Sequence, residues 1–203
     1  MMTGTLYLIG ASVLWGVVHS ILASHGFKHL VSQVAGAAAF FQLYRFAYNL
    51  FSFASLFPIA VMLFTFPDTL LYTIPEPWNY LTTIIQGLAA IALIAGVMQT
   101  GPMEFAGLAQ LMPSYGESKP AELVTSGLYS YVRHPLYTAG LVFIWFSPEM
   151  TVNRLALWTV FTVYIILGAF FEERKLLRDY GSVYAEYKSK TPMLIPKIAN
   201  RKP

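Results

Sequence analysis

Five apolar stretches dominate the sequence and leave few choices of fold. They run roughly over Leu6 to Ala23, Tyr44 to Phe66, Tyr80 to Thr100, Pro135 to Phe146 and Arg154 to Phe171. A helix needs about 20 apolar residues to cross the hydrocarbon core of a bilayer. All but the fourth stretch approach or exceed that length. Backbone polar groups in lipid must be satisfied within their own segment, so these stretches predict membrane-spanning helices.

The composition supports this interpretation and excludes several kinds of site. Of the 203 residues, 56% are hydrophobic and only 11% are charged, whereas a soluble domain carries about 25% charged residues. We therefore predict an all-α integral membrane protein with five transmembrane helices. The absence of cysteine rules out disulfides, thiolate metal sites and cysteine nucleophiles. Four histidines are too few for a histidine-rich di-iron site, and we expect no metal.

The fourth apolar stretch is short and leads directly into the fifth. Pro135 begins it, and Ser147-Pro148-Glu149 ends it, which predicts a short helical hairpin made by spans four and five. Beyond the hairpin, apolar residues with helical periodicity predict a C-terminal amphipathic helix on the membrane or over the bundle: Leu176, Leu177, Tyr180, Val183, Tyr184 and Tyr187. With no repeat or second domain, we expect one domain over residues 1–203, with three spans in 1–100 and a loop, the hairpin and the tail in 101–203.

The distribution of basic residues predicts the orientation. With five spans and an external amino terminus, only Arg154 of the 13 Lys and Arg residues falls outside. Cytoplasmic loops are enriched in Lys and Arg, so we expect a multi-pass protein with its carboxyl terminus in the cytoplasm. The basic face has membrane lipid as its expected partner. Nothing in the pattern supports binding to nucleic acid, and no obligate protein partner is indicated.

This orientation places a polar group at the inner end of every span. Polar side chains in lipid must pair or face water, so we predict one polar cavity that opens to the cytoplasm. The groups are His19 on span one, Arg45, Asn49 and Ser52 on span two, Gln99 and Thr100 on span three, Arg133 and His134 before span four, and Glu172 and Glu173 after span five.

Each of these groups also has a simpler explanation. His19 is equally compatible with hydrogen bonding between helices, and Arg45 with a side chain that reaches up to the lipid headgroups. His25 and His29 have the spacing of a metal-binding pair, but no acidic ligand is near, so interfacial surface is favoured. The Glu172-Glu173 pair is compatible with a charge cluster at a helix end.

The order of the motifs resembles a known superfamily. Glu122-Leu123-Val124-Thr125-Ser126-Gly127-Leu128-Tyr129 is followed by Arg133-His134-Pro135-Leu136-Tyr137, the apolar hairpin, Glu172-Glu173, Tyr184-Ala185-Glu186-Tyr187, and Thr191-Pro192 to Ile195-Pro196. This is similar to the catalytic end of the isoprenylcysteine carboxyl methyltransferase and phospholipid methyltransferase superfamily. The segments Trp15 to Ser20 and Tyr44 to Ser52 resemble nurim and the methanethiol S-methyltransferases.

The resemblance implies a methyltransferase that binds S-adenosylmethionine (SAM) without a Rossmann domain and releases S-adenosylhomocysteine. The sequence holds no Gly-x-Gly, which agrees with this implication but weakens a phosphatidylethanolamine-type substrate. By resemblance, Glu122, Leu123 and Val124 would line the adenosine and Tyr129 would pack on it. His134, Pro135, Leu136 and Tyr137 would hold the amino-acid end, and Glu172, with Glu173 beside it, would pair with the ammonium.

Two departures from the superfamily pattern bear on the methyl acceptor. Ala121 stands where the family commonly has His, and Leu167-Gly168-Ala169 where isoprenylcysteine enzymes place an Arg that reads the substrate carboxylate. A carboxylate acceptor needs such a cation, whereas a neutral thiol needs a proton acceptor. With His19 as that acceptor and Arg45 and Arg133 as further catalytic candidates, we predict methylation of a small or lipophilic acceptor, leaning to a thiol.

Three alternatives stay open. An isoprenylcysteine carboxyl methyltransferase-like or a phospholipid amine methyltransferase activity would use the same cofactor. A non-catalytic nurim-like membrane scaffold would use none, but a scaffold has no physical need for buried charge, so Arg133, His134 and Glu172 argue against it.

Overall fold

The structure is a computed structural model that describes residues 2–112 and 123–196, without the side chains of residues 39 and 41. It is mostly helical, and within this part of the chain four helical segments are long and apolar enough to cross a membrane, together with a shorter apolar helix at Pro135–Trp145. The four segments are Met2–Ala23, Gln42–Thr65, Trp78–Gln99 and Val152–Lys190. The prediction of an all-α integral membrane protein is confirmed. The chain forms two compact units, each described here by itself.

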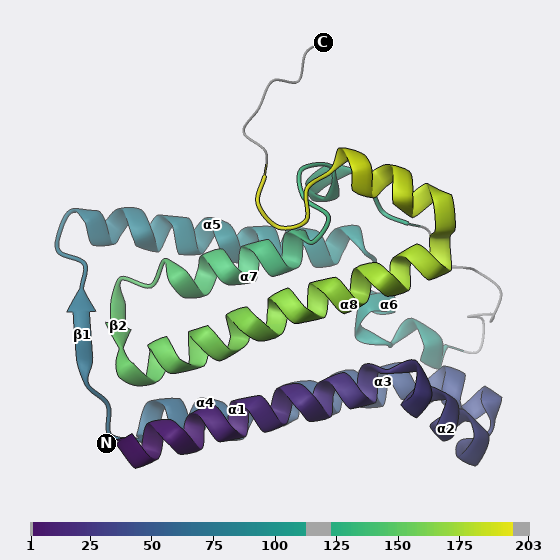
Figure 1. Ribbon diagram of the computed structural model, residues 1–203, viewed down its shortest axis with the longest axis horizontal. Coiled ribbons are helices and arrows are strands. Elements are labelled where there is room, and N and C mark those ends of the chain that lie inside the picture. Colours follow the sequence, from purple (N-terminus) through teal and green to yellow (C-terminus); the bar gives the residue numbers. More distant parts are fainter. Residues whose placement is uncertain (1, 113–122, 197–203) are drawn as a thin grey trace, which may run out of the picture. The chain divides into compact units, whose positions relative to one another are not determined.

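The first unit comprises the described residues within 1–73, 101–120 and 149–164. Its core is the contact of Leu8 on α1, Ile59 on α4 and Leu157 on α8, with Trp15 and Phe161 packed against them. The elements, drawn in Figure 1, are α1 (Met2–Ala23), α2 (His25–Ala35), α3 (Ala37–Ala54), α4 (Phe57–Thr65), β1 (Leu70–Thr73), α6 (Pro102–Ala106), η1 (Ala109–Leu111), β2 (Glu149–Thr151) and the first part of α8 (Val152–Lys190).

The first apolar stretch ends where the sequence predicts, but a further helix follows it. Ser24 stops α1 and caps α2, its hydroxyl oxygen accepting a hydrogen bond from the Phe27 backbone N–H at 3.3 Å. Serine is among the strongest N-cap residues because its oxygen satisfies a free N–H of the first turn. The helix α2 was not among the predicted elements, because only 11 residues separate Ser24 from Gly36 and few of them are strongly apolar.

The second apolar stretch is divided between two helices. Helix α3 ends at Ala54, and α4 begins at Phe57 with Pro58 in its first turn. Proline has no N–H to donate to a preceding turn, so it favours a new helix start. The indole N–H of Trp15 on α1 donates to the Ser55 hydroxyl at this break, at 2.9 Å.

A small antiparallel sheet joins β1 to β2, an addition to the predicted all-α fold. Asp68, just before β1, accepts hydrogen bonds from the backbone N–H groups of Thr69 at 2.8 Å and of Asn153 at 3.0 Å. Asn153 is fully buried and its side-chain oxygen accepts from the Thr5 hydroxyl at 2.6 Å. These polar contacts fix the start of α8 against the start of α1.

The second unit comprises the described residues within 74–100, 121–148 and 165–203. It contains α5 (Trp78–Gln99), η2 (Gly127–Ser130), α7 (Pro135–Trp145) and the rest of α8. Helices α5 and α7 run side by side (Figure 1). Gly96 on α5 allows this close approach because it has no side chain. A Cβ at this position would come 2.7 Å from the Leu136 Cδ2 atom. The Gln86 side chain donates to the Phe143 carbonyl near the other end of α7, at 2.7 Å.

The predicted amphipathic stretch spans two helical parts that meet at a kink within α8. Helix α8 continues from the fifth apolar stretch to Lys190 and bends at Gly181, whose φ of 56° and ψ of −127° are not helical. No proline or glycine interrupts the chain between Phe171 and Tyr180, so the helix has no reason to stop earlier. After the bend, Tyr184 is buried. This residue of the predicted apolar face therefore packs against the protein.

Candidate functional site

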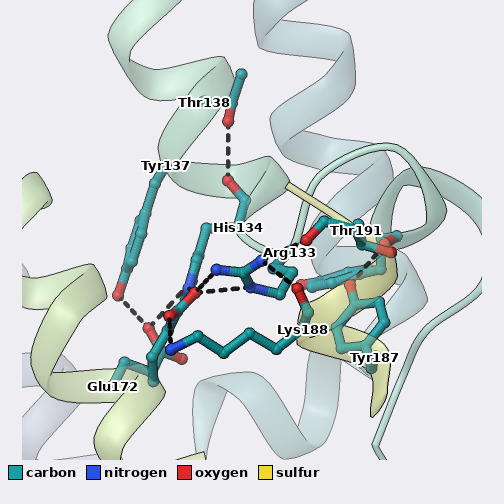
Figure 2. A network of polar contacts seen from close by, with 10 residues as sticks. Arg133, His134, Tyr137, Thr138, Glu172, Tyr187, Lys188 and Thr191 are labelled. Atoms are coloured by element: carbon teal, nitrogen blue, oxygen red, sulfur yellow. Dashed lines mark hydrogen bonds and ion pairs between the residues drawn. The ribbon is translucent and has the colours of Figure 1, made fainter. Parts of the chain in front are cut away.

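A network of polar contacts surrounds the start of α7 in the second unit (Figure 2). The carboxyl-terminal segment runs beside the turn before this helix. The backbone N–H groups of Arg133 and His134 donate to the carbonyls of Pro192, at 2.8 Å, and Met193, at 3.1 Å. The Thr138 hydroxyl donates to the Leu194 carbonyl at 2.7 Å. Segments that lie far apart in the sequence therefore form one cluster.

Glu173 is the buried centre of this network. Only 3% of its surface is exposed. Its Oε1 atom accepts from Arg133 Nε at 2.7 Å and from Arg133 Nη2, and its Oε2 atom pairs with Lys188 Nζ at 2.8 Å. The remaining guanidinium nitrogen of Arg133 donates to the carbonyls of Lys188 and Thr191. Arg133 and Glu173 are thus occupied by groups of the protein itself.

The neighbouring carboxylate, Glu172, is in a different situation. Its side chain is 43% exposed and accepts a hydrogen bond from the Tyr137 hydroxyl at 2.7 Å. The Nδ1 atom of His134 lies 3.6 Å away. Among the described residues, no lysine or arginine forms an ion pair with Glu172. This carboxylate can therefore accept a cationic ligand.

The His134 side chain lies beside Glu172. Its ring is buried and stacks on the Tyr137 ring, with centroids 5.2 Å apart and planes within 7°. Its Nε2 atom lies 3.5 Å from Glu173 Oε1 and has no hydrogen-bond partner in the part of the chain that the structure describes. Burial is the largest influence on the pKa of His134 and lowers it, although Glu172 and Glu173 act in the opposite direction. The imidazole is therefore neutral at physiological pH.

The other described residues predicted to hold a cofactor lie on η2, in the segment before it and in the first turn of α7. Tyr129 lies on η2, where its carbonyl accepts from the Tyr187 hydroxyl at 2.5 Å, and burial together with Glu172 raises the pKa of its phenol. Leu123 and Val124 are half-buried in the segment before η2. Pro135 is buried in the first turn of α7, and Leu136 packs against Gly96. Glu122 lies outside the described residues.

His19 belongs to an aromatic cluster in the first unit. The Tyr164 hydroxyl lies 2.5 Å from His19 Nδ1, and the Tyr48 hydroxyl lies 2.7 Å from Nε2 and 3.1 Å from Nδ1. Trp15 stacks on the imidazole, with ring centroids 4.8 Å apart. The sequence did not single out Tyr48 or Tyr164. Nothing in the sequence separates these two tyrosines from the other 11 in the chain.

Arg45 is not part of either cluster. It is exposed on α3, and within the described residues no hydrogen bond or ion pair reaches its guanidinium. Asn49, one turn further along the same helix, contacts α6: its side chain donates to the Phe105 carbonyl at 2.8 Å. A Cβ at Gly107 would come 2.5 Å from the Phe46 backbone nitrogen, so the backbones approach closely here.

Comparison with known proteins assigns the chain to a class. The sequence model of the phospholipid methyltransferase family matches residues 82–183, half of the chain. The matched region includes most of α5, all of α7 and both carboxylates. The chain therefore belongs to the phospholipid methyltransferase family.

Individual relatives are similar over most of the chain. A methanethiol S-methyltransferase 1 of Bradyrhizobium diazoefficiens is 31% identical over 186 residues, which cover 90% of this chain and 64% of the relative. A methanethiol S-methyltransferase of Crocosphaera subtropica is 28% identical over 213 residues, covering 99% of this chain and 78% of the relative. A protein-S-isoprenylcysteine O-methyltransferase of Schizosaccharomyces pombe is 36% identical over 83 residues, or 37% of this chain and 34% of the relative. No solved structure matches the chain.

Proposed function

We propose that this protein transfers the methyl group of SAM to a small thiol. The observation that carries the proposal is the exposed carboxylate of Glu172, which Tyr137 holds beside the neutral, stacked ring of His134. The similarity to proteins named methanethiol S-methyltransferase over 90% and 99% of the chain supports the choice of acceptor.

The residues of the second unit fit the cofactor. Glu172 would pair with the ammonium of SAM, and the hydrogen bond from Tyr137 would hold its carboxylate in place. The His134 and Tyr137 rings offer aromatic faces, which stabilise cations. Glu122, Leu123, Val124 and Tyr129 would line the adenosine, with Pro135 and Leu136 completing the wall. When bound, SAM supplies an electrophilic methyl group.

Arg133 and Glu173 have a positioning role in this proposal. Their charges compensate each other, and Arg133 also ties the segment after α8 to the start of α7 through the carbonyls of Thr191 and Pro192. Holding the neighbouring Glu172 and His134 in fixed geometry is a substantial part of catalysis, because methyl transfer depends mainly on alignment. For Arg133 we therefore propose a positioning role in place of the predicted catalytic one. The catalytic role of Arg45 stays a prediction, and no contact of its side chain among the described residues supports it.

The acceptor side of the proposal rests on His19. A thiol is a weak nucleophile until its proton is removed, and His19 would accept that proton as general base. The carboxylate of an isoprenylcysteine would need a cation instead. At Leu167-Gly168-Ala169 the chain offers none, and a Cβ at Gly168 would meet no atom within 4 Å. The similarity to the Schizosaccharomyces pombe enzyme keeps carboxyl methylation as the alternative to test.

We further propose five spans in one membrane domain. The four long helical segments would cross the bilayer, and α7 would form the short span of a hairpin with α8. The amino terminus would be external, and the site and the tail cytoplasmic, since 12 of the 13 Lys and Arg residues then lie inside.

The test is a methyl-transfer assay on the purified protein. We would incubate it with SAM and, separately, methanethiol, a prenylcysteine and a phospholipid amine, and measure release of S-adenosylhomocysteine. Release with methanethiol, abolished in Glu172→Ala, supports the proposal. Release only with the prenylcysteine or the amine would assign the alternative acceptor, and no release with any acceptor would favour a non-catalytic scaffold.

A further inference from the structure

The surroundings of His19 limit how it can act on a thiol. Each ring nitrogen already has a tyrosine hydroxyl within 2.7 Å, Tyr164 at Nδ1 and Tyr48 at Nε2. A neutral imidazole has one N–H donor and one nitrogen that accepts. One tyrosine must therefore donate to the ring while the other accepts from it, and the accepting nitrogen is covered by a hydroxyl. A thiol cannot give its proton to His19 directly without displacing a tyrosine.

The distances distinguish the two tyrosines. Of the two ring nitrogens, the Tyr164 oxygen bonds to Nδ1, at 2.5 Å. The Tyr48 oxygen lies between the two nitrogens, at 2.7 Å and 3.1 Å, and so cannot lie in line with the lone pair of either. Hydrogen bonds weaken as the donor moves away from that direction. Tyr164 is therefore the better placed of the two to donate its proton to the ring.

The packing of the first unit holds Tyr164 in this position. Its ring lies against α1 at Gly16, where a Cβ would come 3.0 Å from the Tyr164 Cδ2 atom. Trp15 packs edge-on to the same ring, with centroids 5.6 Å apart, and stacks on His19. Two residues of α1, Trp15 and Gly16, thus fix the hydroxyl and the imidazole relative to each other.

We infer that Tyr164 relays the thiol proton to His19 and is a catalytic residue for the proposed thiol methylation, on which this inference rests. The thiol S–H bond breaks and its proton binds the Tyr164 oxygen, while the Tyr164 O–H bond breaks and its proton binds His19 Nδ1. The result is a thiolate, a neutral tyrosine and an imidazolium. With SAM bound, the thiolate sulfur would form a bond to the methyl carbon as the bond from that carbon to the cofactor sulfur breaks, and S-adenosylhomocysteine would be released. Tyr48 is a positioning residue, whose oxygen accepts from the imidazolium N–H.

Tyr164→Phe tests the relay because it removes the hydroxyl and keeps the ring. We would measure turnover with methanethiol and with an aromatic thiol, which is already ionised near neutral pH. General-base assistance is typically worth about 10² to 10⁴ in rate, so turnover of methanethiol should fall at least tenfold at neutral pH and recover at alkaline pH. Turnover of the aromatic thiol and the affinity for S-adenosylhomocysteine should change less than twofold.

Tyr44→Phe is the matched control. Tyr44 is on α3, one turn before Tyr48, and its hydroxyl donates to the Leu22 carbonyl at 2.5 Å, not to His19. This variant should keep wild-type selectivity between the two thiols, and Tyr48→Phe should show a smaller loss than Tyr164→Phe.

Three results would overturn the relay. In the first, Tyr164→Phe methylates methanethiol normally, which would leave His19 to act without it. In the second, the variant loses both thiols equally, which would make Tyr164 structural. In the third, Tyr48→Phe alone shows the selective loss, which would assign the relay to Tyr48. If the wild-type protein methylates no thiol, the proposed function itself is wrong, and that outcome is separate from these three.

Discussion

Two adjacent carboxylates in this protein have different surroundings. Glu173 is buried and neutralised by Arg133 and Lys188, whereas Glu172 is exposed and bonded to Tyr137. The sequence presents them as an equivalent pair. Which of the two faces inward depends on the rotation of α8 and on the segment after Gly181, and neither can be read from the motif.

The two carboxylates should therefore respond differently to substitution. Glu172→Gln removes the charge proposed to bind the cofactor ammonium, and loss of such a pair costs about 2 kcal/mol or more. We expect S-adenosylhomocysteine affinity to fall at least tenfold in calorimetric titration, with little change in thermal stability.

Glu173→Gln is its counterpart and should act on stability first. It leaves the buried Arg133 without a negative partner, which costs about 3 to 5 kcal/mol when one member of a buried pair is removed. We expect a clearly lower midpoint of thermal unfolding in detergent. Equal effects of both substitutions on both measurements would contradict the division of roles.

His134 should make stability depend on pH. Burial lowers the pKa of its imidazole below the ordinary value of about 6.5, so the folded chain binds fewer protons than the unfolded chain just below that pH. Stability contributed by the neutral ring is present above about pH 6.5 and is lost as the pH falls toward the lowered pKa. The unfolding midpoint should drop between pH 7.5 and pH 5.5, and His134→Gln should drop less. Equal drops would show that other groups cause the acid sensitivity.

The motif order predicted that His134, Tyr137 and Glu172 belong to one site, and the structure brings these three residues into contact. Tyr48 and Tyr164 escaped notice for a physical reason. Aromatic side chains are common in membrane helices as ordinary packing, and this chain has 13 tyrosines. Only the three-dimensional contact with His19 separates these two from the rest.

At the scale of the elements, glycine determines how closely the helices of the first unit approach. Gly16 lies on α1 against the Tyr164 ring, and Gly10 lies on the same helix with no atom within 4 Å of a Cβ built there. The two positions are therefore a matched pair.

Gly16→Ala should disturb the His19 cluster while Gly10→Ala should not. The added methyl group must displace the Tyr164 ring by a few tenths of an ångström, and overpacking of this kind costs about 1 to 3 kcal/mol. We expect lower thermal stability and a severalfold loss of thiol methylation in Gly16→Ala. Gly10→Ala should be at least as stable as wild type, because alanine is favoured over glycine in a helix interior by about 0.5 to 1 kcal/mol. Equal behaviour of the two variants would show that Tyr164 tolerates movement.

Helix ends were less predictable than the existence of helices. The end of α1 at Ala23 and the short α7 agree with the sequence interpretation. The break between α3 and α4 was missed, because apolar residues continue through Ser55 and Leu56 and the signal is the single Pro58. Helix α2 was missed because it is too short and polar for a span.

At the scale of the whole molecule, the proposed orientation can be tested without removing native cysteines, since the chain has none. Thr69 precedes β1 and Ser182 follows the bend in α8, and both are exposed. In intact cells, an impermeant maleimide should label Thr69→Cys and leave Ser182→Cys unlabelled until the cells are opened. Labelling of Ser182→Cys alone would invert the orientation.

Helix α7 is half the length of its neighbour α5, and this difference links the enzyme to the thickness of its membrane. Its 11 residues span about 16 Å at 1.5 Å per residue, against a hydrocarbon core of about 30 Å. Beyond Trp145 the chain runs without helix to Pro148, whose carbonyl accepts from the Ile74 N–H at 2.8 Å. Lipids with long acyl chains would surround this irregular backbone with hydrocarbon, a mismatch that membranes relieve by thinning. Activity should therefore vary with acyl-chain length, so that the lipid composition of the membrane would regulate the proposed methylation of a small thiol.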